Sequence, residues 1–223
     1  MSQIRLAVIV PAYGGNITAE HARMWVEFGN VVGASSETFR LTTFGHLDMQ
    51  PIDRARNMAV AQAMVRDSTW LLMVDADTWV EPGKDSLEDA GVQLLRMIAD
   101  ANRRGAVIVS APVIKRIEGH EDRVLAVYGK PAEDNKHVGF PDSWIAEQRR
   151  SLVPVHAVGA ACCAINLEKL ANTEIEYGWT DRLSEDLEFC RRIREHFGDN
   201  SIMVDPRVRT AHRSKPTALY SSP

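Results

Sequence analysis

Two aspartates, two positions apart, give the strongest chemical signal in this chain of 223 residues. Asp75 and Asp77 follow directly on the apolar run 70–74. In an extended segment residues i and i+2 point to the same side, so both carboxylates can face one cation. Hard oxygen ligands that leave room for water suit Mg²⁺ or Mn²⁺ held jointly with phosphate oxygens. We therefore predict that Asp75 and Asp77 bind a divalent metal ion.

Two other interpretations of the same residues are open. Aspartates often form turns after strands, and Pro82-Gly83 follows closely. An apolar strand followed by Asp-x-Asp also resembles the HAD phosphatases, in which Asp75 would be the nucleophile. Trp79 departs from that pattern, and the segment follows two strand–helix units instead of opening the fold. The metal site is favoured because ligands of open α/β sheets bind at the carboxyl ends of strands.

The elements that must position these carboxylates alternate along the first half of the chain. Dense apolar runs favour buried strands, and segments with one apolar face favour helices. This βαβαβαβ order predicts an α/β fold with a mostly parallel central sheet and helices on both faces. We expect strands at 4–10, 39–44, 70–74 and 106–111, and helices from Asn16 or Thr18 to about Gly33, at 52–65 and at 86–104.

The second half is expected to form a smaller mixed part of the same Rossmann-like domain. It should contain strands at 123–128, 159–165 and 202–204 and a helix at 185–197, with Ser184 as its cap and Gly198 at its end. Residues 129–151 are expected to be a long mobile connection able to act as a lid. We expect one domain at 1–215, with a nucleotide-binding half at 1–112, an acceptor-side half at 113–215 and a loose tail at 216–223.

Composition limits the environment and the partners. Hydrophobic residues make up 45% and charged residues 25%, as in soluble globular proteins, and the formal net charge of −4 argues against broad capture of nucleic acid. Three cysteines, two of them adjacent, do not suit a disulfide framework and favour a reducing cytoplasm. No apolar run reaches the ~20 residues of a transmembrane helix.

The order of several short motifs resembles the family-2-type glycosyltransferases of the GT-A fold, over roughly residues 4 to 213. Each motif is weak alone, and their order and spacing carry the resemblance. The motifs are Val10-Pro11-Ala12-Tyr13, Ala55-Arg56-Asn57, Asp75-Ala76-Asp77, Gly159-Ala160-Ala161, Ser184-Glu185-Asp186 and His212.

This resemblance implies roles for individual residues. Asp186, with Glu185 beside it, would be the catalytic base that deprotonates the acceptor hydroxyl. His212 would join Asp75 and Asp77 at the metal or the diphosphate. The acidic residue that contacts the base or ribose in such enzymes has one nearby candidate, Asp48. The donor would also contact Pro11, Ala12, Tyr13, Arg56, Asn57, Asp75 and Ala76.

Simple chemistry supports a role for Asp186 and also offers a plainer explanation. A carboxylate in the first turn of a helix stays ionised in the field of the helix dipole, as a general base must. Acidic residues are favourable at helix starts in all proteins, however, so Ser184-Glu185-Asp186 needs no catalysis to explain it.

We expect transfer of a sugar from a nucleoside diphosphate sugar, most readily a UDP- or GDP-sugar, to a hydroxyl acceptor. The reaction would depend on Mn²⁺ or Mg²⁺ and would invert the anomeric centre. A nucleotidyltransferase and a non-catalytic nucleotide-sugar-binding module are the alternatives. The sequence leaves the acceptor and the oligomeric state open.

Overall fold

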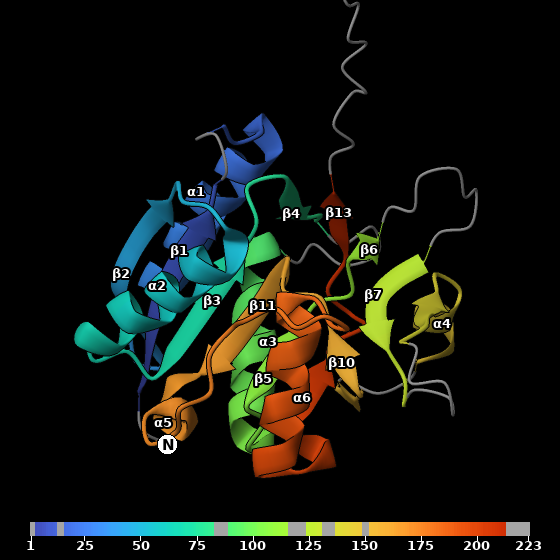
Figure 1. The fold of residues 1–223 in the computed structure, drawn as a ribbon. Coiled ribbons are helices and arrows are strands. Elements are labelled where there is room, and N and C mark those ends of the chain that lie inside the picture. The colour runs from blue at the N-terminus through green and yellow to red at the C-terminus, as the bar shows by residue number, and fades with distance from the viewer. Residues whose placement is uncertain are drawn as a thin grey trace, which may run out of the picture.

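The computed structural model describes residues 3–12, 16–82, 89–115, 124–130, 137–148 and 152–212. Its centre is a seven-stranded sheet in the order β2-β1-β3-β11-β5-β12-β9 (Figure 1). The strands are β1 (Ile4–Pro11), β2 (Phe39–Leu47), β3 (Trp70–Val74), β5 (Ile108–Ser110), β9 (Val153–Pro154), β11 (Cys162–Asn166) and β12 (Ile202–Val204).

Most strands of this sheet run in one direction. β1 pairs in parallel with β2 and with β3, and β12 pairs in parallel with β5. β11 lies antiparallel between β3 and β5, and β9 lies antiparallel to β12. β1, β2, β3, β5 and β12 therefore share one direction. The predicted mostly parallel α/β sheet is confirmed.

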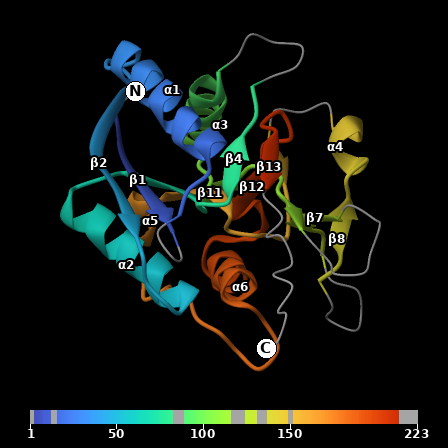
Figure 2. The ribbon, with the colours of Figure 1, turned by 90° about the horizontal axis from the view of Figure 1, so that it is seen from above.

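Alternate residues of each central strand pack against opposite layers of helices. Every residue of β3 is buried. Trp70, Leu72 and Val74 join one apolar cluster, and Leu71 and Met73 join the other. One face is covered by α1 (Ala19–Ala34) and α3 (Ala90–Arg104), and the other by α2 (Ile52–Val65) and α6 (Glu185–Phe197), as Figure 2 shows.

The predicted helices are present, and their ends have local causes. The Thr18 side chain caps α1 by accepting a hydrogen bond of 3.0 Å from the His21 N–H. α3 ends at Gly105, which adopts φ 67°, a left-handed conformation that costs glycine little. The observed α3 begins at Ala90, and the predicted start at Ser86 lies outside the described residues.

Two small sheets lie beside the main one. The four-stranded sheet contains β10-β7-β6, with β8 paired to β7, and the two-stranded sheet pairs β4 with β13. Residues 129–151 were expected to be a connection without helix or strand, but they contain β8 (Gly139–Pro141) and α4 (Trp144–Glu147). The remaining elements are β4 (Thr78–Val80), β6 (Ile114–Lys115), β7 (Val124–Tyr128), β8 (Gly139–Pro141), α4 (Trp144–Glu147), β10 (Ala157–Val158), α5 (Leu167–Leu170), a 3₁₀ turn (Asp199–Ser201) and β13 (Thr210–His212).

One predicted strand differs in detail. Residues 159–165 do not form a single strand, because β10 ends at Val158 and β11 begins at Cys162. The intervening residues turn the chain from the small sheet into the main one, where Asn166 ends β11 and caps α5 through a hydrogen bond from the Lys169 N–H. Among the described helices none combines the length and the apolar character that a membrane crossing requires.

Candidate functional site

The carboxyl ends of the first three strands are tied together by backbone hydrogen bonds. The N–H of Ala12 donates to the carbonyl of Leu47 at 3.0 Å, and the N–H of Ala76 donates to the carbonyl of Pro11 at 3.1 Å. Asp48 follows Leu47 directly. The residues predicted to contact the donor from β1, β2 and β3 are thus brought to one edge of the sheet, where open α/β folds bind their ligands.

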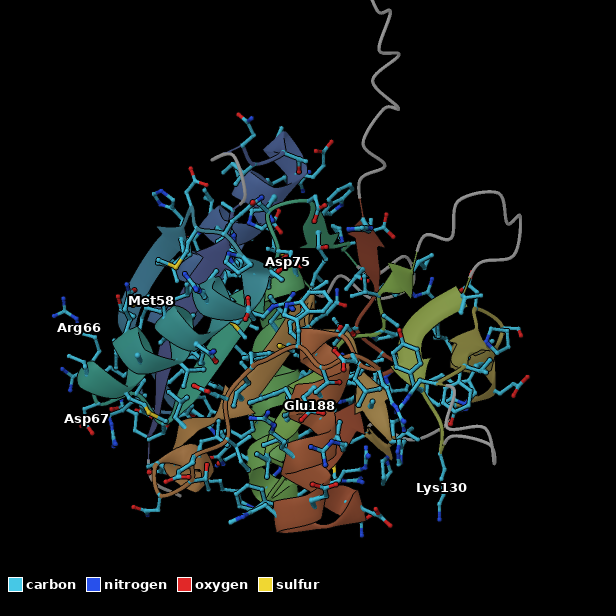
Figure 3. All side chains as sticks on the ribbon, in the orientation of Figure 1. Met58, Arg66, Asp67, Asp75, Lys130 and Glu188 are labelled. Carbon is cyan, nitrogen blue, oxygen red and sulfur yellow. The ribbon has the colours of Figure 1, made fainter. Side chains whose placement is uncertain are left out.

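Asp75 lies at this edge (Figure 3). Its two carboxylate oxygens have different surroundings. Oδ2 is 3.4 Å from the guanidinium of Arg56. Oδ1 is buried and has no hydrogen-bond partner among the described residues. Burial raises the pKa of Asp75, the neighbouring charge of Asp77 raises it further, and Arg56 and His212 oppose the shift. A carboxylate oxygen shielded from water and without a donor is a good ligand for a cation.

Asp77 and His212 meet beside Asp75. The Nε2 of His212 is 3.3 Å from the Oδ2 of Asp77. The pairing of β13 with β4 produces this contact, because it places His212 opposite Thr78. The Asp77 side chain remains 42% exposed, so it can also reach a ligand from solvent. The structure therefore places Asp77 against His212 and both of them within electrostatic reach of Asp75.

The chemistry of these donors fits Mg²⁺ or Mn²⁺. Such ions usually bind to one or two carboxylates and complete their coordination with water and substrate phosphates. Within the described ranges no three His, Cys, Asp or Glu side chains are already arranged as a metal centre. The fit accordingly rests on the uncompensated Oδ1 of Asp75 and on the nearby carboxylate of Asp77.

A buried histidine supports the turn that follows Asp77. His21 on α1 is fully buried, and its Nδ1 lies 2.6 Å from the carbonyl of Thr78. Its Nε2 accepts a hydrogen bond of 2.6 Å from the indole N–H of Trp25, so Nδ1 must carry the proton. Burial lowers the pKa of His21, in agreement with this neutral tautomer. Sequence reasoning missed His21, for which the only signal is its i,i+4 spacing from Trp25 on a helix.

Arg56 points inward, towards Asp75, Glu185 and Tyr177. It is 4% exposed and forms ion pairs with Asp75 and with Glu185, while its guanidinium carbon lies 5.7 Å from the centre of the Tyr177 ring. Burial opposes its charge, but Asp75, Tyr177 and Glu185 together raise its pKa above the ordinary value. The side chain links the end of β3 to the start of α6.

Asn57, the next residue on α2, makes a second link to the same region. Its Nδ2 donates to the carbonyl of Tyr177 at 2.9 Å, and its Oδ1 accepts from the N–H of Tyr177 at 2.8 Å. These bonds hold the segment that leads into α6. The predicted donor contact of Asn57 stays a prediction, and any such contact would have to share an amide already engaged on both sides.

The two acids at the start of α6 have different surroundings. Glu185 is 6% exposed and lies against Arg56, and burial raises its pKa in spite of that positive charge. Asp186 is partly exposed. Its Oδ1 accepts hydrogen bonds from the hydroxyl of Ser184 and, at 2.8 Å, from the N–H of Leu187. Asp186 is thus an oriented carboxylate that keeps Oδ2 for another partner.

A glycine leaves space in front of Asp186. A Cβ at Gly159 would lie 2.8 Å from the Cβ of Ala126 and 3.6 Å from the Oδ2 of Asp186. Tyr128, on the same strand as Ala126, has its pKa raised to about 12 by burial and by the charge of Asp186. The base candidate therefore faces the small sheet, in the half of the chain predicted to hold the acceptor.

Some predicted residues cannot be placed. Tyr13 and the tail 216–223 lie outside the described residues, as do 131–136 and 149–151 of the predicted lid. The roles of the individual residues stay predictions.

Comparison with known proteins identifies the fold. No protein-family model and no curated protein matches the sequence. Among solved structures, A197 from STIV has a TM-score of 0.55 at 12% identity, covering 95% of this chain and 87% of that one. The chain thus has an α/β fold that solved structures share without close sequence similarity.

Two further matches are glycosyltransferase-like structures of the GT-A type. GalNAc-T7, solved with UDP, GalNAc and Mn²⁺, has a TM-score of 0.50 at 12% identity, and TarS from S. aureus has a TM-score of 0.50 at 14% identity. They cover 94% and 90% of this chain, which spans only 44% and 35% of their own lengths. The chain has a GT-A-like fold.

Proposed function

We propose that this chain is a metal-dependent glycosyltransferase that moves a sugar from a nucleoside diphosphate donor to a hydroxyl acceptor. The observation that carries the proposal is the buried Oδ1 of Asp75, which lacks a hydrogen-bond donor among the described residues and lies close to Asp77 and His212. The likeness in fold to GalNAc-T7, whose structure contains UDP, GalNAc and Mn²⁺, supports this choice of ligand.

Asp75, Asp77 and His212 would hold Mn²⁺ or Mg²⁺ at the edge of the sheet. The ion would supply Lewis-acid stabilisation of the diphosphate leaving group. Pro11, Ala12, Asp48 and Ala76 belong to the joined ends of β1, β2 and β3 and would form the floor beneath the nucleotide.

Asp186 would act as the general base. The Ser184 hydroxyl and the Leu187 N–H fix one of its oxygens, which leaves Oδ2 to accept the proton of an acceptor hydroxyl. Attack by that acceptor in a single displacement inverts the anomeric centre. Glu185 is buried against Arg56 and would stabilise the site without touching the acceptor.

The buried thiols support the proposal of a cytoplasmic location. Cys162, Cys163 and Cys190 are all free and buried, and burial raises the pKa of Cys163 and Cys190 to about 12. Protonated, unpaired thiols of this kind support a reducing compartment such as the cytoplasm.

Thermal unfolding with a ligand panel tests the proposal. UDP-, GDP-, CDP- and TDP-sugars would be added with Mn²⁺ and again with a chelator. One donor class should raise the unfolding temperature when Mn²⁺ is present and not when the chelator is present. A ligand that binds only the folded state stabilises it in proportion to RT ln(1 + [L]/Kd).

Asp77→Asn is the matched variant for this panel. It should keep the unfolding temperature of the unliganded protein and lose the shift that depends on Mn²⁺, since an amide is a weaker ligand than a carboxylate. An unchanged shift would remove Asp77 from the metal site. Consumption of a nucleoside triphosphate with release of pyrophosphate would instead identify a nucleotidyltransferase.

A further inference from the structure

Arg56 occupies a place between the two chemical ends of the proposed site. It lies in the first half of α2 and reaches Asp75 at the end of β3 through one nitrogen and Glu185 at the start of α6 through another. A guanidinium can hold two carboxylates at once because its donors form a rigid planar fork. The ammonium group of lysine has no such fork.

The burial of Arg56 separates this role from phosphate binding. At 4% exposure, with both terminal nitrogens used and Tyr177 against its face, it has little surface to offer a donor. Asn57 adds hydrogen bonds to the backbone of Tyr177, in the segment leading to α6. Two consecutive residues of α2 therefore hold the metal end and the base end of the site relative to each other.

We propose that Arg56 is a positioning residue, which fixes the carboxylate of Asp75 for the metal ion and the first turn of α6 for the base Asp186. This inference rests on the proposed function, since it assigns what Arg56 does for that site. Arg56 acts through Asp75 and Glu185 and does not itself contact the substrates.

A purely electrostatic role of Arg56 and a positioning role predict opposite changes in the affinity for Mn²⁺. If Arg56 supplied only positive charge, its removal would leave a more acidic site, and Mn²⁺ would bind more tightly. If Arg56 positions Asp75, its removal frees that carboxylate to move or pair elsewhere, and Mn²⁺ binds more weakly. The sign of the change in Mn²⁺ affinity decides between them.

The experiment titrates the purified full chain with Mn²⁺ alone and measures free Mn²⁺ by electron paramagnetic resonance. Arg56→Lys and Arg56→Met should each raise the dissociation constant by about tenfold or more, as expected when the support of a metal ligand is lost. Arg66→Met is the matched control, since this exposed arginine lies at the far end of α2, away from Asp75 (Figure 3), and it should leave the constant unchanged. An unchanged constant in Arg56→Lys together with tighter binding in Arg56→Met would overturn the inference.

A second measurement, hydrogen exchange, tests how Asp186 is held. A double variant controls for a failure of Arg56→Met to fold. The N–H of Leu187 donates to Asp186, so its hydrogen exchange reports directly on how the base is held. Exchange there should become several-fold faster in Arg56→Met than in Arg66→Met. The double variant Arg56→Met/Glu185→Gln removes the buried Arg56–Glu185 ion pair as a unit, which is expected to cost less stability than removing one partner alone. It should show the same faster exchange and the same weaker binding of Mn²⁺.

The two measurements separate this inference from the proposed function. If the wild-type chain binds neither Mn²⁺ nor any nucleotide sugar, the proposed function fails, and the exchange at Leu187 alone then decides the role of Arg56. Exchange that stays at the wild-type rate in both Arg56→Met and the double variant overturns the positioning role in either case.

Discussion

At the scale of single residues, neighbouring acids in this protein differ in what surrounds them. Glu185 and Asp186 are adjacent, yet Glu185 is buried against Arg56. Asp186 is partly exposed, and one of its oxygens accepts hydrogen bonds from Ser184 and Leu187. Helical geometry explains the difference, because consecutive residues are turned about 100° from each other and face different neighbours. Of the two, only Asp186 is accessible to the acceptor that we propose.

Replacing Asp186 by asparagine should separate binding from chemistry. The amide keeps the size of the side chain but cannot take a proton, so the donor should bind normally while transfer falls by about 10² to 10⁴-fold. Calorimetric titration with the donor and a transfer assay would measure the two properties. Asp199→Asn, at an exposed position beyond the far end of α6, should change neither. Full transfer activity in Asp186→Asn would mean that another group is the base.

Glu188 gives a prediction about pH. Its side chain is 2% exposed and pairs with Arg191 at 2.7 Å and Arg192 at 2.8 Å. Hydrogen bonds from these arginines lower its pKa to about 2, against 4.5 for an ordinary glutamate. The unfolded chain therefore takes up a proton at a higher pH than the folded chain. The stabilisation is complete above about pH 4.5 and is lost as the pH falls towards 2.

Glu188→Gln should accordingly lower the free energy of unfolding by about 1–2 kcal/mol at pH 7, a range that allows for the exposure of both arginines. Urea unfolding of both proteins at pH 7, 4.5 and 3 would measure it. The difference between them should be nearly the same at pH 7 and 4.5 and clearly smaller at pH 3. A difference that is the same at all three pH values would contradict the assignment of the low pKa to these ion pairs.

At the scale of elements, α1 and α3 approach so closely that only glycine fits between them. A Cβ at Gly91 would lie 2.8 Å from the Cα of Phe28 and 3.2 Å from a methyl carbon of Val31. Gly91→Ala should therefore lower the free energy of unfolding by about 1–3 kcal/mol, because the two helices must separate.

Gly33→Ala is the matched control for this prediction. Gly33 lies near the end of α1, and no atom is within 4 Å of the position of its added Cβ. Alanine there should raise stability by up to about 1 kcal/mol through its helix propensity. Thermal unfolding measures both variants. Equal effects of the two substitutions would show that the contact between α1 and α3 is not tight.

Elements with strong local patterns were predictable from the sequence. The bounds of α2, β3, α6 and β12 match the expected ones. Dense apolar runs define the two strands, and Gly198 ends α6 as predicted, but the predicted cap Ser184 makes no capping hydrogen bond and its hydroxyl donates to Asp186 instead. β4 and β13 were missed because each has three residues and little apolar pattern. Their pairing depends on a contact between segments 130 residues apart, which local periodicity does not encode.

The contacts among the candidate site residues could not be predicted from the sequence, and the roles of those residues stay predictions. The motifs named Asp75, Asp77 and His212, and in the structure Asp77 contacts His212 while both influence the pKa of Asp75. Arg56 was expected near the donor, which stays a prediction, and its ion pairs with Asp75 and Glu185 were not foreseen. A sequence shows that a helix carries an arginine, but the partner of that arginine depends on which elements pack across it.

At the scale of the whole molecule, the two halves of the chain are interleaved. β11, from the second half, lies between β3 and β5 from the first, and β12 pairs with β5. Both apolar clusters contain residues from both halves. The proposed single domain at 1–215 is therefore expected to unfold as one cooperative unit.

A fragment of residues 1–112 tests this expectation. Without β11 and β12, it would leave β3 without one neighbour and β5 without either, so their buried backbone and apolar side chains would meet water. The fragment should show no cooperative transition by scanning calorimetry, whereas the full chain should show one. A sharp transition in the fragment, with near-ultraviolet circular dichroism like that of the full chain, would establish an independent first half.

The pairing of β13 with β4 also has a consequence for synthesis on the ribosome. Of the described strands β13 is the last to be translated, so the imidazole of His212 reaches the carboxylate of Asp77 only after every other strand has emerged. A nascent polypeptide stalled before residue 210 would already have both aspartates but not the histidine. Completion of the proposed cation-binding centre thus waits for the last of the described strands.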